Sequence, residues 1–265
     1  MIPLLLATAV LAGGSQDVLI NEVLLNPAGT DTVEFVEVSG PPDHDLSDFT
    51  VLNIEGDGAG AGLIDVVLPI GQTDANGLWL SAYLSNTLEN GTSTYLLVKG
   101  FTGSVGQDLD TDNDGVFDIT PWSSMVDSVA FTDGGLDIFY SPVLLTPNFD
   151  GFNANLAGAS RIPNGQDTNQ VSDWRRNDNT MIGMPQALPG TLYSFEVLNT
   201  PGAVNAEFCP GDFNADSQIN LDDLQILLFN FGASVVPATN GDASINGVVN
   251  LDDLQILLFN FGIHC

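Results

Sequence analysis

The chain has 265 residues, which is enough for one domain of ordinary size and one small additional unit. It carries 34 acidic side chains against 4 basic ones, a formal net charge of −30 at pH 7. Such a charge repels phosphate backbones and anionic lipid headgroups, which excludes nucleic acid as an expected partner, and it attracts divalent cations.

The chain begins with an apolar run, MIPLLLATAVLAGGSQ. A short apolar stretch followed by small residues is typical of a secretory signal peptide, and this one is too short to span a bilayer. We therefore expect residues 1–15 to be a signal peptide, and the mature chain to be secreted, extracellular or attached to the cell surface. No later stretch is apolar over enough residues to predict a transmembrane segment in the mature chain.

Residues 16–206 contain short apolar runs separated by Gly, Pro, Asn and Asp. The runs are VLINEVLL, VEFVEVSG, FTVLNIEG, LIDVVLPI, LWLSAYL, STYLLVKG, MVDSVAF and LDIFY. Many short strands with frequent turn signals predict an all-β sandwich. Because no helical periodicity of any length occurs here, a parallel α/β fold is not expected.

The order of these segments resembles a bacterial lamin-tail domain, which is an immunoglobulin-like β-sandwich. The resemblance rests on VLINEVLLNP, VEFVEVSG, DLSDFTVLN, VDSVAFTDGG, SRIPNGQDTNQVSDW and TPGAVN, and it covers nearly all of residues 16–206. It implies an extracellular binding or structural role, with no catalytic residues in the domain itself.

One insertion in this region is rich in carboxylates. Residues 108–118 read DLDTDNDGVFD, which places Asp110, Asp112, Asp114 and Asp118 around Gly115, similar to thrombospondin type 3 calcium repeats. So dense a cluster repels itself unless a cation neutralises it. We predict a calcium site here; the alternative is a disordered acidic loop.

The residues that catalysis would need are few. His44 and His264 are the only histidines, and no nucleophile elbow, zinc-protease helix or phosphate-binding loop is present. Glu22, Glu34 and Glu37 are carboxylates of the kind that a glycosidase pair uses, yet they fit strand-edge and turn positions equally well. In a regular strand Glu34 and Glu37 point to opposite faces. We do not expect enzymatic activity.

The most specific signal is a repeat, because NLDDLQILLFNFG occurs at 220–232 and again at 250–262, preceded by GDFNADSQIN and GDASINGVVN. Oxygen-bearing groups recur at positions 1, 3, 5, 7, 9 and 12 of each loop, which is the ligand spacing of an EF-hand calcium loop, with position 7 contributing its backbone carbonyl. The predicted calcium ligands are Asp212, Asn214, Asp216, Gln218, Asn220 and Asp223 in the first copy and Asp242, Ser244, Asn246, Val248, Asn250 and Asp253 in the second. The alternative for these positions is turn chemistry combined with helix N-caps.

The two loops differ at their tightest point. Gly247 occupies the sharp turn of the second loop, whereas Ser217 stands there in the first and tolerates positive φ less well. The first loop carries three carboxylates and the second two. We expect the first loop to bind through charge and the second through better geometry.

A helix is predicted after each loop. Apolar residues recur there at three- and four-residue steps and form one stripe per helix, and a glycine follows each stripe. We expect the two loop-helix units to pack about a pseudo-two-fold axis and to bury these stripes against each other, because neither unit can bury its stripe alone. The stripes are Leu224, Leu227, Leu228 and Phe231 in the first unit and Leu254, Leu257, Leu258 and Phe261 in the second.

The two cysteines of the chain lie at the ends of the repeat segment. A disulfide between Cys209 and Cys265 would stabilise the unit by about 4 kcal/mol through the closed loop. The alternative is two unpaired thiols.

Residues 207–265 resemble a type I dockerin, a small all-α module of two calcium loop-helix repeats with a closing cysteine pair. The resemblance implies that the module binds a protein partner, a cohesin or another surface scaffold, through loop positions 10 and 11. These positions are Leu221, Asp222, Leu251 and Asp252. It also links the chain to extracellular assemblies that act on polysaccharide.

Together these features predict an exported, calcium-binding adhesion or assembly protein, in which a dockerin-like module docks the β-sandwich of residues 16–206 onto a protein partner. Two alternatives stay open at this point. In the first alternative the chain is a component of a polysaccharide-degrading assembly. In the second it is a structural protein in which the repeat is a stabilising cap.

Overall fold

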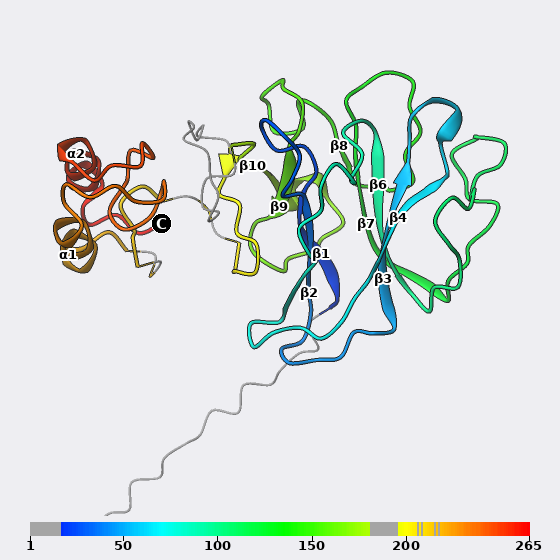
Figure 1. Ribbon diagram of the computed structural model, residues 1–265, viewed down its shortest axis with the longest axis horizontal. Helices are drawn as coiled ribbons and strands as arrows, with labels where there is room; N and C mark the ends of the chain where they lie inside the picture. The colour runs from blue at the N-terminus through cyan, green and yellow to red at the C-terminus, as the bar shows by residue number, and fades with distance from the viewer. Residues whose placement is uncertain (1–16, 181–195, 206, 208, 215, 217) are drawn as a thin grey trace, which may run out of the picture.

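The structure is a computed structural model and describes residues 17–180, 196–205, 207, 209–214, 216 and 218–265. The signal peptide predicted at residues 1–15 and the sharp-turn residue Ser217 lie outside the described residues. The described chain consists of a mainly β body followed by a small unit with two helices (Figure 1).

The first sheet of the body has six strands in the order β11-β10-β9-β1-β2-β5. Strand β1 is central and pairs antiparallel with both β2 and β9. The strands are β1 (Leu19–Leu24), β2 (Phe35–Ser39), β5 (Leu78–Leu80), β9 (Gly158–Arg161), β10 (Trp174–Asn177) and β11 (Glu196–Val197).

The second sheet has five strands in the order β4-β3-β6-β7-β8. Its three longest neighbours, β3, β6 and β7, are antiparallel, and β8 joins the edge in parallel. The strands are β3 (Phe49–Glu55), β4 (Ile64–Pro69), β6 (Ser93–Lys99), β7 (Ser124–Phe131) and β8 (Leu144–Leu145).

The two sheets pack against each other over one main core. Ile20 and Val36 from the first sheet and Val51, Tyr95 and Phe131 from the second belong to this core. Alternation along the strands turns these residues inward. The prediction of a mainly β fold built from two sheets is confirmed.

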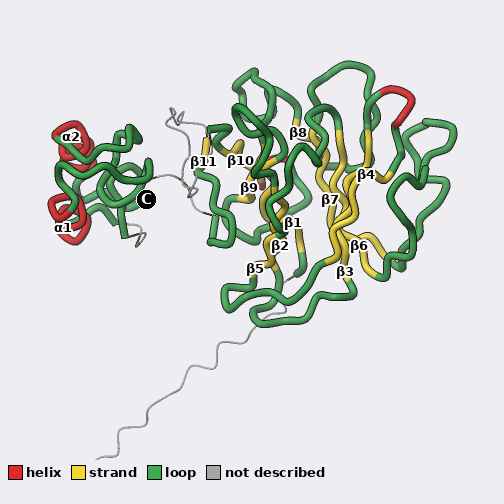
Figure 2. Tube along the Cα trace, viewed as in Figure 1, coloured by secondary structure: helices red, strands yellow, loops and turns green. Residues whose placement is uncertain are grey.

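A second apolar layer covers the outer face of the five-stranded sheet. Leu109, Phe117 and Trp122, from the long loop between β6 and β7, pack with Tyr140 onto Leu52 and its neighbours. Figure 2 shows how much of the body is made of such loops. The acidic segment 108–118 is therefore anchored to the sheet by its own apolar residues.

The C-terminal unit contains α1 (Leu221–Phe229) and α2 (Leu251–Asn260). Each helix begins with a capping box, in which the Asn220 or Asn250 side chain accepts from the backbone and the aspartate at the third helical position bonds back. The core of the unit consists of Ile219 and Val249 from the loops and Leu227 and Leu257 from the helices.

Short backbone pairings join the two halves reciprocally. Gly232 donates to the carbonyl of Val249 (2.8 Å), and Gly262 donates to the carbonyl of Ile219 (2.8 Å). The glycine that follows each helix by two or three residues thus binds the loop of the other half. This exchange is the pseudo-two-fold arrangement that identical copies permit.

Three details differ from the sequence-based expectation. The run LDIFY is not a strand: the backbone N–H of Ile138 donates to the carbonyl of Gly56, and that of Tyr140 donates to the side-chain hydroxyl of Thr94 instead of to a strand backbone. Strands β8 to β11 are short and lack an apolar alternation that would have predicted them. The mutual burial of the two stripes is correct only in part: Leu227 and Leu257 are buried, but Leu228, Leu258, Phe231 and Phe261 are exposed. The loop residues Ile219 and Val249 fill the space between the halves in their place.

Candidate metal centres

The second repeat loop, residues 242–253, is organised around a buried carboxylate. Asp242 accepts the N–H of Asn246 at Oδ1 (3.1 Å) and the N–H of Gly247 at Oδ2 (2.8 Å). Gly247 has φ +77°, which is the left-handed conformation expected at the sharp turn. The first loop position therefore wraps the next five residues around itself.

Asp253, at position 12, closes the same loop. Its Oδ1 accepts the N–H of Ser244 (2.8 Å) and its Oδ2 the N–H of Asn250 (2.7 Å), so one side chain holds both the loop and the start of α2. Burial, followed by the charge of Asp253, raises the pKa of Asp242 above its usual value. Two buried carboxylates that repel each other favour a cation between them.

The first repeat loop, residues 212–223, shows the same pattern. Asp216 donates its N–H to Oδ1 of Asp212 (3.2 Å), as Asn246 does to Asp242. Asp223 accepts the N–H of Asn214 (3.3 Å), which is the counterpart of Ser244, and the N–H of Asn220 (2.9 Å), and it is buried like Asp253. The predicted equivalence of the two copies extends to their hydrogen bonds.

In the acidic loop at 108–118, the first residues of the candidate site form the same hydrogen bonds as the first residues of the second repeat loop. Asp110 accepts the N–H of Asp114 at Oδ1 (3.1 Å) and of Gly115 at Oδ2 (2.8 Å), and Asp114 accepts the N–H of Val116 (2.9 Å). The corresponding bonds from position 7 to position 5 are also 2.9 Å in the loops at 212 and 242. Among the described residues, the three loops therefore share two hydrogen bonds, one from position 5 to position 1 and one from position 7 to position 5.

A tyrosine of the β-sandwich body holds this loop in place. The Tyr140 hydroxyl donates to Oδ2 of Asp110 (2.9 Å), and Tyr140 stacks on Phe117. Burial alone would raise the pKa of Asp110, but hydrogen bonds from Gly115, Tyr140 and Asp114 together lower it. Asp110 is thus held as a buried carboxylate.

The remaining carboxylates of the loop gather around Asp110. Carboxylate oxygens of Asp110, Asp112 and Asp118 lie within 4.8 Å of one another, and Asp114 is not part of that group. The pKa of Asp112 is raised, first by the charge of Asp114. The structure brings three of the four predicted ligands together.

The donor set of all three loops fits calcium. It consists of carboxylate, amide, hydroxyl and carbonyl oxygens, which calcium prefers, without a thiolate or imidazole among the predicted ligands. In the first repeat loop Asn214, Asp216 and Gln218 are exposed around the buried Asp223, so solvent has access to the ligand positions.

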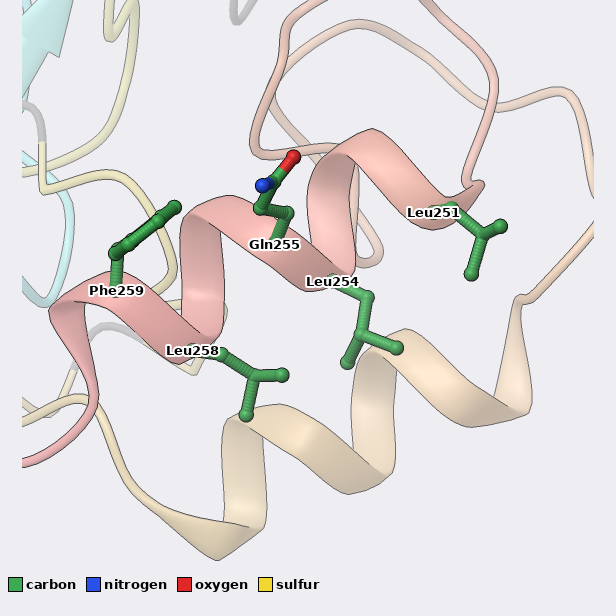
Figure 3. A pocket seen from close by; sticks show the side chains of 5 residues that line it. All are labelled: Leu251, Leu254, Gln255, Leu258 and Phe259. Carbon is green, nitrogen blue, oxygen red and sulfur yellow. The ribbon is translucent and has the colours of Figure 1, made fainter.

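The exposed faces of the two helices are apolar. Leu221 is 64% exposed and Leu251 69%, and Phe229 and Phe259 reach 92% and 79%. In Figure 3, Leu254 and Leu258 extend from α2 toward α1, whereas Phe259 and Gln255 point away from it. An apolar pocket on α2 is lined by Leu251, Leu254, Gln255, Leu258 and Phe259.

The predicted contact residues Leu221, Asp222, Leu251 and Asp252 are all exposed at the helix starts. The structure adds Leu228, Phe229, Leu258 and Phe259 to the same surface; we call these eight residues the helix face. Helical spacing could have found them, because residues seven and eight positions after Leu221 return to its side of the helix.

Cys209 and Cys265 form a disulfide that closes the C-terminal unit, with a sequence separation of 56 and a Cα to Cα distance of 6.0 Å. Of the two possibilities that the sequence left open, the structure therefore shows the paired one. The next residue inward, His264, forms a backbone bridge with Gln218 in the first repeat loop.

Glu22 and Glu37 lie within strands and Glu34 directly precedes β2, and all three are fully buried instead of solvated at an edge or turn. Glu22 and Glu37 are register partners on β1 and β2. Burial raises the pKa of Glu22 to about 7, and burial together with the charge of Glu22 raises the pKa of Glu37 to about 8. Their partners include the N–H groups of Thr200 and Gly202, so the segment after β11 covers them.

Comparison with models of known families, with curated proteins and with solved structures found no match to this chain. Within the described residues, no helix has the length and apolar character needed to cross a membrane.

Proposed function

We propose that this chain is an exported, calcium-binding docking protein, in which a dockerin-like C-terminal unit attaches an immunoglobulin-like, lamin-tail-like β-sandwich to a protein partner at a surface or in an extracellular assembly. The observation that carries the proposal is the duplicated loop-helix unit, with one hydrogen-bond pattern in both loops and one exposed apolar face on both helices. The disulfide supports export, because such bonds persist in oxidising compartments.

Calcium would act on the helix face through the loops. Asp223 and Asp253 each belong both to a loop and to the first turn of a helix. An ion that fixes the loop therefore also fixes the start of the helix, where Leu221 or Leu251 is displayed. We expect the helix face to be ordered with calcium and disordered without it.

The chemistry of the helix face indicates the partner's surface. Its exposed leucine and phenylalanine side chains are bordered by Asp222 and Asp252, and neither helix contains a basic residue. A complementary surface is apolar at its centre and basic at its rim. A cohesin-like domain or another surface scaffold with that character is the expected partner.

The duplication predicts two equivalent binding orientations. A partner that contacts mainly one helix can dock on α1 or, after a half-turn, on α2, because the exposed residues of the two helices are identical. Loss of one copy then halves the number of binding modes and raises the apparent Kd only about twofold. Loss of both copies removes binding.

The experiment begins with the full mature chain immobilised and exposed to an envelope extract of the source cell, once with calcium and once with chelator. The Kd of the captured protein is then measured for Phe229→Ala, Phe259→Ala and the double variant, with Leu136→Ala, an exposed apolar residue of the body, as control. We expect single variants and control within about twofold of the parent. The double variant should bind at least about thirtyfold more weakly, as expected for buried aromatic anchors.

Two outcomes favour the alternatives. If no protein is captured although calcium folds the unit, the repeat is a stabilising cap. If the purified chain hydrolyses a glycan and loses that activity when a body carboxylate is neutralised, the chain is a catalytic component of a polysaccharide-degrading assembly. An unaltered Kd in the double variant would place the contact surface away from the helices.

A further inference from the structure

A group of buried polar side chains lies between the sheets at one end of the body. Asn53 and Glu55 on β3 are register partners of Tyr95 and Ser93 on β6, so the four side chains occupy adjacent positions on the inner face of the five-stranded sheet. Tyr95 belongs to the main core. Asn53, Ser93 and Tyr95 are therefore buried against the opposite sheet, whereas Glu55, at the end of β3, is half-buried.

Most of these polar groups have no hydrogen-bond partner. Asn53 is 1% exposed, and both its amide nitrogen and its amide oxygen are unpaired. The hydroxyls of Ser93 and Tyr95 are also buried and form no hydrogen bond of good geometry, although Ser93 lies close enough to Tyr95 to lower its pKa. Oε1 of Glu34, which enters from the six-stranded sheet, is a further buried oxygen without a partner. A buried polar atom left unpaired costs about 1–3 kcal/mol, so several together indicate that a ligand or bound water belongs here.

Three carboxylates lie at the mouth of this region. Oxygens of Glu55, Asp65 and Glu89 come within 4.8 Å of one another. Burial and the neighbouring carboxylates raise the pKa of Glu55 and of Asp65. The basic side chains of the chain are engaged elsewhere: Lys99 with Asp48, Arg161 with Asp127, Arg175 with the carbonyl of Ser172 and Arg176 with Asp150. In the part of the chain that the structure describes, no Lys or Arg side chain is paired with this cluster.

The unpaired groups and the carboxylates belong to one site. Ser93 stands directly across from Glu55 in the strand register. Burial raises the pKa of Tyr95 well above its usual value; the neighbouring Ser93 hydroxyl opposes this shift, and the charges of Glu34 and Glu89 add to it. The carboxylate cluster that contains Glu55 is therefore next to the buried oxygens of Ser93, Tyr95 and Asn53.

We propose that a divalent cation of the calcium type binds at this end of the β-sandwich, with Glu55, Asp65 and Glu89 as anionic ligands and the oxygens of Ser93 and Asn53 completing its surroundings directly or through bound water. All available ligands are hard oxygens, which suits calcium better than zinc. The site is separate from the three loops and does not depend on the docking function.

The ion would tie three parts of the body together. Glu55 ends β3, Asp65 lies on the edge strand β4, and Glu89 precedes β6 in the segment that returns from β5 of the other sheet. Calcium at this site fastens the edge strand and the crossover to the centre of the sheet. It would stabilise the body itself, independently of the C-terminal unit.

The test compares the full chain with the variant Asp65→Asn/Glu89→Gln and with the matched control Asp17→Asn/Asp43→Asn, which neutralises two exposed carboxylates of the body. Calcium ions bound per chain are counted by equilibrium dialysis at saturation. We expect the variant to bind one ion fewer than the parent and the control to bind the same number. Equal numbers in the variant and the parent would overturn the proposal and leave a water-filled polar pocket.

A thermal measurement in chelator keeps the test decisive if the double variant folds poorly. Without an ion the carboxylates only repel, so the single variant Asp65→Asn should melt above the parent in chelator and gain less from calcium. A gain from calcium equal to that of the parent would contradict the site. Failure of the three loops to bind calcium would lower the count in parent and variant alike, and the difference of one ion would remain.

Discussion

Two equivalent glycines offer a test of how the C-terminal unit is packed. Gly211 and Gly241 precede the two repeat loops, with φ of +110° and +103°. A Cβ added at Gly241 would lie 2.6 Å from Cα of Leu227 on α1, whereas one added at Gly211 would lie 3.4 Å from Cα of Leu257 on α2. An alanine would therefore suffer similar backbone strain at either position, and only Gly241→Ala adds a clash with a helix backbone.

The magnitudes follow from these distances. Positive φ costs an alanine about 1–2 kcal/mol, so Gly211→Ala should lower the free energy of unfolding of the unit by about that amount. Gly241→Ala adds overpacking, commonly about 1–3 kcal/mol, and should cost about 2–5 kcal/mol in total. Because α1 and α2 are the α-helices of the described residues, helical circular dichroism during urea unfolding reports on this unit. Equal costs at the two sites would refute the close approach of residue 241 to α1.

Two further predictions concern the body. The folded form holds protons on Glu22 and Glu37 that the unfolded chain releases above the usual glutamate pKa of 4.5. These two groups should therefore make the body most stable below pH 4.5, and this contribution should be lost as the pH rises toward about 8. The loss should be about 1.4 kcal/mol for each unit of pKa shift. Urea unfolding followed by tryptophan fluorescence should show this slope in the parent and a flatter one in Glu22→Gln/Glu37→Gln; the same slope in both would contradict it. In limited proteolysis, calcium should protect the loop at 108–118 in the parent and in the control variant Asp43→Asn. It should not protect the loop in Asp110→Asn, because the Asp110 carboxylate accepts the hydrogen bonds that form the turn. If calcium does not change the cleavage rate of the parent, no ion binds in this loop.

The local features of this protein were predictable from the sequence. The spacing of Asp242, Asn246 and Asp253 indicates a loop that wraps around its first residue, and Gly247 stands where the chain takes positive φ. These relations extend over about a dozen residues, where the covalent chain itself sets which groups can meet. The short β-rich runs and the two helices were predictable for the same reason.

Burial was decided by the tertiary structure. Leu227 and Leu228 are adjacent leucines, but only Leu227 is buried. Loop residues fill the space between the halves in which the sequence predicted the rest of the helix stripe. A helical pattern shows which residues share a face, but not how wide the covering surface is.

The positions of the buried carboxylates also depended on distant segments. Glu22 and Glu37 lie on strands whose sequences suit an edge, yet residues 199–205 close over them from more than a hundred positions away. Likewise, Glu55 and Glu89 meet only because the sheet register places β3 beside β6. The sequence by itself determined which local loops could hold calcium, whereas tertiary contacts decided which carboxylates are withdrawn from water, because burial depends on segments that no local pattern brings together.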